Sequence, residues 1–280
     1  MRDPRLWLRL ICMAGFAVAA SPALASEIST DALGRLPPAD VVILGEIHDN
    51  PEHHRNQALA VAALMPRALV FEMLTPEQAG KTPPDRADAD SMARAYGWQS
   101  SGWPDFSMYH PIFAAAPEAR IYGGDLPAGE AQRAVRDGAA PVFGAEAARY
   151  GLTVRLAPED QAAREAEQGS AHCNALPEEL LAGMVEAQRL RDAALARAVV
   201  QALDETGGPV AVITGSGHAR VDRGIAAVLE LVAPQARVLS VGQIEAPAAA
   251  QQPYDLWIVT GAVPRDDPCA AFAADPPQGG

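Results

Sequence analysis

The chain has 280 residues, a formal net charge of −13 and a single lysine among its 22 basic residues. This length fits one α/β domain with a full hydrophobic core. An acidic surface repels nucleic-acid phosphates and anionic membranes, so we expect no nucleic-acid partner. A local pocket for a carboxylate remains compatible with this charge, because arginine side chains bind carboxylates through paired hydrogen bonds.

The first 25 residues are typical of a cleaved secretion signal. Three arginines precede an apolar stretch over residues 10–20, and Ala23-Leu24-Ala25 is a small-residue cleavage site. The apolar stretch is short for a transmembrane helix. We therefore predict an exported, periplasmic protein, with membrane association through a retained segment as the alternative. The predicted organisation is a signal at 1–25, one domain at 26–270 and a flexible tail at 271–280.

Short apolar runs alternate with helical patterns along the rest of the chain, which predicts a mostly parallel central sheet flanked by helices. In chain order, the predicted strands cover residues 41–44, 68–71, 121–124, 210–214, 237–241 and 256–260. Helices are predicted from Pro51, from Pro158 and over 177–202, since proline is favoured in a first helical turn, and another is predicted from Ala219 onwards. The Pro- and Asp-rich stretch 76–90 is expected to be an irregular or helical excursion.

Two of these strands are followed by the same short motif. Gly45-Glu46-Ile47-His48 follows the first predicted strand, and Gly215-Ser216-Gly217-His218 follows the fourth. The second strand leads into Glu72, and the third leads to Asp125. Ligands bind at the carboxyl ends of strands in open α/β sheets. We therefore expect the two histidines and the carboxylates to converge on one site.

Two chemistries fit this set of side chains. His48, His218 and Glu72 form a two-histidine, one-carboxylate set that can hold a divalent metal with an open position for water. Without a metal, the same residues and Glu46 can supply a general base and its orienting acid. The alternative is structural, in which the glycines form tight turns and the histidines cap neighbouring helices.

Residues 96–111 concentrate aromatic side chains in a chain that is only 5 % aromatic. They form either a satellite hydrophobic cluster under a loop or a wall, including Trp103, for a flat apolar ligand. Tyr109 and His110 carry groups that can ligate haem iron, and His53 and His54 at a predicted helix start are further candidates. All four are also compatible with purely structural roles. Covalent haem attachment is excluded, because the chain has no Cys-x-x-Cys-His motif.

Two cysteines, Cys173 and Cys269, remain after removal of the predicted signal. An exported location permits a disulfide bond between them. Such a bond would tie the C-terminal segment to the central helical region, whereas the alternative is two unpaired thiols.

Motifs over nearly the whole mature chain carry a family resemblance. They include Val42–Pro51 (VILGEIHDNP), Trp103–Tyr109 (WPDFSMY) and Gly215–Arg220 (GSGHAR), with further matches at residues 53–54, 71–73, 172–173, 187–192 and 267–269. In this order they resemble the ChaN-like haem-binding uptake proteins of the Tiki superfamily. The resemblance implies an α/β fold related to Tiki proteases and erythromycin esterases, and a role in haem and iron acquisition.

The resemblance also implies how a ligand is held. It implies haem bound between the subunits of a homodimer with a tyrosine on the iron, and Tyr109 is the matching tyrosine. An outer-membrane haem receptor is the expected partner. In the hydrolytic relatives, residues matching Glu46, His48, Glu72 and His218 form the working site. We favour a haem-binding protein, with an esterase or metallopeptidase as the alternative. Several ChaN-like proteins are lipoproteins, whereas this signal looks like an ordinary cleaved one.

Overall fold

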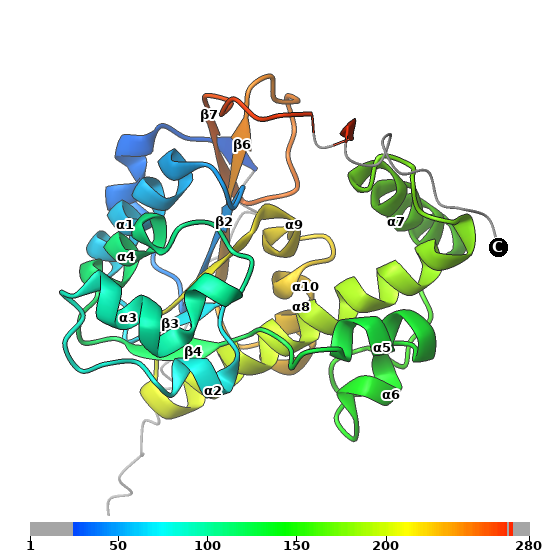
Figure 1. Cartoon of the computed structure of the whole chain (residues 1–280), viewed down its shortest axis with the longest axis horizontal. Coiled ribbons are helices and arrows are strands. Elements are labelled where there is room, and N and C mark those ends of the chain that lie inside the picture. Colours follow the sequence, from blue (N-terminus) through cyan, green and yellow to red (C-terminus); the bar gives the residue numbers. More distant parts are fainter. Residues whose placement is uncertain (1–24, 268, 271–280) are drawn as a thin grey trace, which may run out of the picture.

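The computed structural model describes residues 25–267, 269 and 270 (Figure 1). The predicted signal therefore lies, except for Ala25, outside the described residues, and so does the predicted tail at 271–280. Within the described ranges, no helix has the length and apolar character needed to cross a bilayer.

A seven-stranded sheet forms the centre of the fold, and every pair of neighbouring strands is parallel. The strand order is β1-β7-β6-β2-β5-β3-β4. The strands are β1 (Ser26–Glu27), β2 (Val41–Glu46), β3 (Ala68–Phe71), β4 (Arg120–Gly123), β5 (Val210–Gly215), β6 (Val238–Glu245) and β7 (Leu256–Thr260). The predicted α/β class and all six predicted strands are confirmed. Only the two-residue edge strand β1 has no counterpart in the sequence pattern.

Helices cover both faces of the sheet (Figure 1). They are α1 (Pro51–Leu64), α2 (Pro76–Ala79), α3 (Ala89–Tyr96), α4 (Phe106–Ala115), α5 (Glu130–Asp137), α6 (Ala139–Phe143), α7 (Pro158–Ala171), α8 (Glu178–Thr206), α9 (Ser216–Ala219) and α10 (Ile225–Val232), with 3₁₀ turns η1 (Thr30–Arg35) and η2 (Trp98–Ser100). Alternate residues of β2 enter two separate cores: Val41 and Ile43 pack with α8 and α10, whereas Val42 and Leu44 pack with α1 and α4.

The predicted helix from Ala219 onwards is instead divided into α9 and α10. At the break, the backbone of Gly224 passes close to that of His218, and a Cβ atom on Gly224 would lie 2.1 Å from the His218 carbonyl oxygen. Only glycine fits this close approach. The interruption therefore fixes the backbone that carries His218.

The C-terminal segment folds back across the molecule. Cys173 and Cys269 form a disulfide bond, as one of the two sequence alternatives predicted. Arg265 pairs with Asp49 after β2 and with Glu245 at the end of β6. These contacts hold residues after β7 against both the sheet and the C-terminal end of α7 (Figure 1).

Candidate functional site

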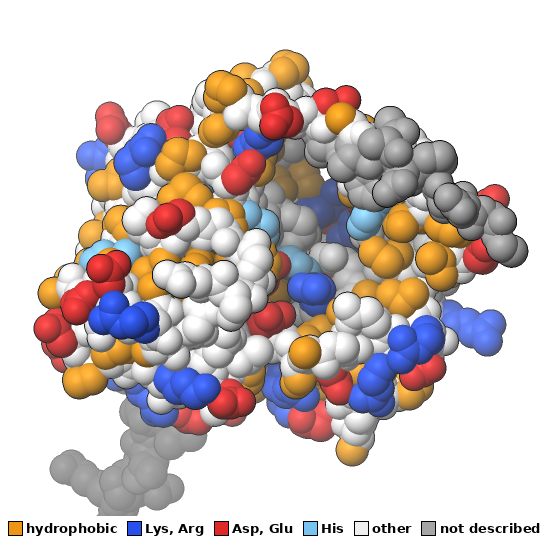
Figure 2. Space-filling view, in the orientation of Figure 1, with side chains coloured by type: hydrophobic (Ala, Val, Ile, Leu, Met, Phe, Trp, Pro, Cys, Tyr) orange, Lys and Arg blue, Asp and Glu red, His pale blue; other side chains and the backbone are white. Residues whose placement is uncertain are grey.

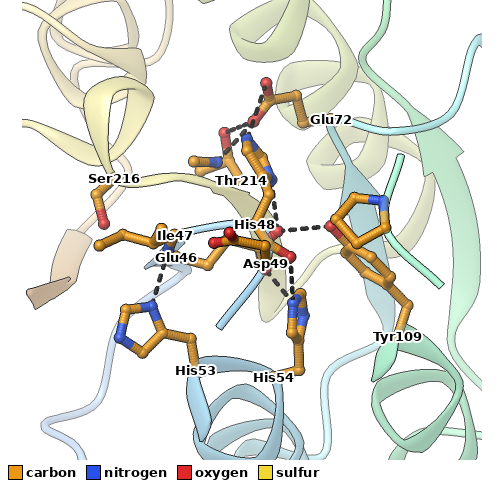
Figure 3. A network of polar contacts seen from close by, with 12 residues as sticks. Glu46, Ile47, His48, Asp49, His53, His54, Glu72, Tyr109, Thr214 and Ser216 are labelled. Atoms are coloured by element: carbon orange, nitrogen blue, oxygen red, sulfur yellow. Dashed lines mark hydrogen bonds and ion pairs between the residues drawn. The ribbon is translucent and has the colours of Figure 1, made fainter. Parts of the chain in front are cut away.

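The site lies where β2, β5 and β3 end beside one another. β2 and β5 pair so that Glu46 lies opposite Gly215, and β3 flanks the other side of β5. Polar residues end or follow each strand, so Glu46, His48, Glu72 and His218 come together at the carboxyl edge of the sheet. Figure 3 shows Glu46, His48 and Glu72 at this edge. The predicted convergence of these four residues is thus what the fold produces.

Carboxylates and imidazoles alternate through this site. Glu72 Oε1 lies 3.9 Å from His48 Nε2 and 3.5 Å from His218 Nε2. The opposite nitrogen of each ring bonds a carboxylate of its own: His48 Nδ1 is 2.7 Å from Glu46, and His218 Nδ1 is 2.6 Å from Asp192. The result is a chain in the order Asp192, His218, Glu72, His48, Glu46, which we call the acid–imidazole chain.

Glu72 at the centre of this chain is held rigidly. Its Oε2 accepts hydrogen bonds from the Thr214 hydroxyl at 2.7 Å and from the Gly215 N–H at 2.6 Å. Burial favours the neutral acid, but the two histidines and these donors outweigh burial and hold the pKa of Glu72 well below its usual range. Glu72 is therefore a buried carboxylate anion.

The two histidines both have raised pKa values but differ in exposure. Burial acts to lower the pKa of His218, but Glu72 and Asp192 outweigh it and raise that pKa to about 10, so this ring is an imidazolium at neutral pH. The pKa of His48 is also raised, because its hydrogen bond to Glu46 and the charge of Glu72 exceed the effect of burial. His48 has 31 % of its side chain exposed, whereas the Glu46, Glu72 and His218 side chains are buried.

The predicted divalent metal on His48, His218 and Glu72 is not supported by this geometry. His218 Nε2 and Nδ1 lie 3.5 Å and 2.6 Å from Glu72 and Asp192, so both nitrogens of the ring already have carboxylate partners. Across the described part of the chain, no group of three or more His, Cys, Asp or Glu side chains could hold a metal ion.

Tyr109 belongs to this network instead of to a ligand-facing surface. Its hydroxyl donates to Glu46 at 3.0 Å, and the residue is completely buried. Burial and the neighbouring Glu46 raise its pKa far above the usual value for tyrosine. Ligation of iron by Tyr109 stays a prediction, and the other four tyrosines of the chain are buried as well.

Three other predicted haem-binding histidines are also occupied. His53 accepts from the Ile47 N–H at Nδ1 and lies 2.8 Å from the Thr260 hydroxyl at Nε2, and burial lowers its pKa to about 4. Nε2 of His54 lies 2.8 Å from the carbonyl oxygen of His48, and Nε2 of His110 lies 2.8 Å from that of Arg86. Each ring thus has a structural partner, and His53 and His54 are buried.

Most of the aromatic stretch forms part of the hydrophobic core. Trp98, Phe106 and Tyr109 are buried among α1, α4 and the sheet, as the structural alternative predicted. Trp103 differs from these residues because it is partly exposed. Its ring lies against the ring of His48, with centroids 4.8 Å apart. Trp103 thus lies at the rim of the acid–imidazole chain.

Sequence reasoning did not assign a role to Asp192, Gln188 or Thr214. Gln188 and Asp192 are one helical turn apart on α8, and both lie within hydrogen-bond distance of His218 Nδ1. Their four-residue spacing places them on one helix face. That spacing is visible in the sequence, but the partner across the fold is not.

A hollow opens beside this site, between the sheet edge and α7 (Figure 2). Histidine and basic side chains are visible around it in the space-filling view. One pocket in this region has a volume of about 230 Å³ and is lined by residues that include Gln188 and Asp192. The acid–imidazole chain is therefore flanked by space for a ligand.

The fold and this strand-edge site define an α/β protein with a polar network at the carboxyl end of a parallel sheet. A model of the family described as haem-binding uptake, Tiki superfamily, ChaN matches residues 32–229. The chain belongs to this family, which confirms the resemblance seen in its motifs.

Comparison with solved structures supports the same fold. The chain is similar to ChaN of Campylobacter jejuni, solved for its cofacial haem binding, with 18 % identity, a TM-score of 0.60 and coverage of 81 % of this chain and 88 % of that chain. A succinoglycan biosynthesis protein (14 % identity, 74 % and 66 % coverage, TM-score 0.35) and a Bacillus cereus protein (12 %, 86 % and 76 %, TM-score 0.36) are more distant. No curated protein matches the chain significantly.

Proposed function

We propose that this protein binds haem and serves in haem uptake as an exported, periplasmic protein. The observation that carries the proposal is membership of the haem-binding uptake family over residues 32–229. The predicted secretion signal supports a location outside the cytoplasm. A haem-uptake protein at that location would pass its ligand to or from an outer-membrane receptor, which we keep as the proposed partner.

The proposed iron ligand is His172 at the end of α7. Its Nδ1 lies 2.8 Å from the Gln168 carbonyl, a contact in which Nδ1–H donates and Nε2 keeps its lone pair. Nε2 has no hydrogen-bond partner among the described residues, and the residue is partly exposed. A hydrogen bond from the ring nitrogen that does not bind the metal orients a ligating histidine and increases its basicity. Tyr109 offers neither access nor a free hydroxyl.

Two copies of the chain are proposed to share the bound haem. The structural neighbour from Campylobacter jejuni binds haem cofacially. A homodimer that places His172 of each copy at a common surface would bury two faces of the macrocycle, which a single flat surface cannot do. Size measurement with and without haem tests this part directly.

Visible-absorbance titration with ferric haem tests the binding and its ligand together. The wild-type protein is expected to give a saturable Soret shift. His172→Ala should alter or abolish that shift, whereas Tyr109→Phe and the control His110→Ala should leave it unchanged. If the Soret shift were altered in Tyr109→Phe but not in His172→Ala, Tyr109 would be the iron ligand. The buried surroundings of Tyr109 would then have to move to admit haem. No saturable shift in the wild type would remove the proposal.

The acid–imidazole chain favours a second candidate function, hydrolysis of an ester or peptide bond. His48 is the one member of the chain with a substantially exposed side chain, and its hydrogen bond to Glu46 orients it as a general base for water. The adjacent His218 imidazolium pairs with Glu72 and Asp192, and so fixes the carboxylate that lies beside His48. Haem binding alone assigns no role to this arrangement.

Hydrolysis of p-nitrophenyl acetate by the purified protein provides the test. His48→Ala and His218→Gln should each remove catalysed hydrolysis, while the Soret titration of both variants stays like that of the wild type if the two functions use separate residues. Wild-type hydrolysis no faster than buffer, or equal rates in all three proteins, would eliminate the esterase. A peptide substrate with a fluorescent leaving group then distinguishes an esterase from a peptidase.

A further inference from the structure

Three arginines surround the 230 Å³ pocket between α7, α8 and the segment after α9. They are Arg164 from α7 and Arg220 and Arg223 from the segment that joins α9 to α10. Cavities that enclose whole drug-sized ligands measure about 300–1,000 Å³. This pocket is smaller, so it fits an arm of a ligand better than a complete macrocycle. Figure 2 shows the hollow in the surface on this side of the molecule.

The guanidinium groups of this arginine pocket are held in place by acidic neighbours. Arg220 makes two hydrogen bonds to Asp222, and Arg164 bonds Asp160 one turn away on α7. The Arg164 and Arg223 side chains are only 13 % and 14 % exposed. Preorganised arginines lose little conformational freedom when they bind, which favours recognition of a carboxylate.

Glu167 marks the position that a ligand carboxylate would take. A single oxygen of its side chain, Oε1, lies 3.5 Å from Arg220 and accepts a hydrogen bond from Arg223. The Glu167 side chain is 54 % exposed, so it lies at the mouth of the pocket and not in its floor. Arg223 Nε is buried, has no hydrogen-bond acceptor and lies 3.7 Å from Asp222 Oδ2. An incoming carboxylate can thus displace Glu167 and use the same donors.

The pocket is also continuous with both parts of the site. Gln168 and Ala171 line one wall, and Ala171 directly precedes His172. Gln188 and Asp192 line another wall and bond His218 of the acid–imidazole chain. A ligand anchored between the arginines therefore extends toward His172 on one side and toward His218 on the other.

We propose that the arginine pocket is a carboxylate-binding subsite and that it holds a propionate arm of the bound haem. This assignment deepens the proposed haem-binding function and rests on it. The ring and iron lie outside the pocket, near His172, while the carboxylate replaces Glu167 on Arg220 and Arg223.

Haem and haem dimethyl ester are the probes, because they share ring and iron while the ester has no free carboxylate. Wild-type protein should bind haem at least about tenfold more tightly than the ester, as expected for lost charged hydrogen bonds. Arg223→Gln should weaken haem binding by about tenfold and leave the affinity for the ester unchanged. Arg149→Gln is the matched control, because Arg149 does not line the pocket and contacts exposed Glu146 and the ring of Tyr150 instead.

Glu167→Gln is a second variant, and it tests the same subsite if Arg223→Gln folds poorly. Removing the competing carboxylate should strengthen haem binding and leave ester binding unchanged. Equal wild-type affinities for haem and ester would overturn the subsite while leaving haem binding intact. Equal weakening of both ligands in Arg223→Gln would also overturn it, since the arginine would then act only on the fold.

Absence of any haem binding would overturn the proposed function, and a second probe then decides the subsite separately. Succinate carries carboxylates on a short apolar chain and fits the class of ligand proposed. A rise in the melting temperature of the wild type with succinate, lost in Arg223→Gln but kept in Arg149→Gln, would retain a carboxylate site without haem. No rise in the wild type would overturn the subsite as well.

Discussion

The charged state of His218 makes a quantitative prediction about stability. Its pKa is raised from 6.5 to about 10 in the folded protein because Glu72 and Asp192 hold the imidazolium. At about 1.36 kcal/mol per unit, this difference contributes at most ~5 kcal/mol to folding. Because the folded pKa exceeds the unfolded value, the contribution is complete below pH 6.5 and disappears as the pH rises through 10.

We therefore expect the wild-type free energy of unfolding to fall by several kcal/mol between pH 6.5 and 10, measured by urea denaturation with the disulfide intact. In His218→Gln, which keeps a polar side chain but cannot titrate, this decrease should be much smaller. His110→Gln is the control, since it lies outside the acid–imidazole chain, and its decrease should match that of the wild type. An equally steep decrease in His218→Gln would refute the reasoning.

Three further predictions concern two single positions and the disulfide bond. Gly215→Ala places a Cβ atom 2.9 Å from His48 Nε2, so hydrolysis should fall sharply while circular dichroism stays native. Tyr109→Phe removes a buried hydrogen bond to a carboxylate and should cost about 1.5–3 kcal/mol in urea denaturation. Replacing both Cys173 and Cys269 with serine opens a link across a sequence separation of 96 residues, and the melting temperature should drop, with up to about 4–5 kcal/mol lost.

The strands and the convergence of their ends could be predicted because buried parallel strands read as continuous apolar runs. Val41 to Leu44 and Val210 to Ile213 are buried at every position. A polar residue directly after such a run must lie at the sheet edge. This argument correctly brings together Glu46, His48, Glu72 and His218 without any knowledge of helix packing.

The burial of Tyr109 could have been predicted from the spacing of the aromatic residues, which the sequence analysis considered only as a composition. Phe106, Tyr109 and Phe113 recur at three and four residues, which is the pattern of a buried helix face, and all three are buried on α4. The role of Asp192 could not be predicted in the same way. Its bond to His218 depends on how α8 crosses the end of β5, which is decided by packing between segments distant in the sequence.

The register of β2 and β5 has a consequence for when the site can exist. Their pairing joins Val41–Glu46 to Val210–Gly215, so Glu46 and His48 have no His218 to face until most of the chain is available. Contacts between such distant segments form late, because a long loop must close first. A nascent or translocating chain therefore carries only half of the acid–imidazole chain. The acid–imidazole chain can therefore act only after both segments have folded together.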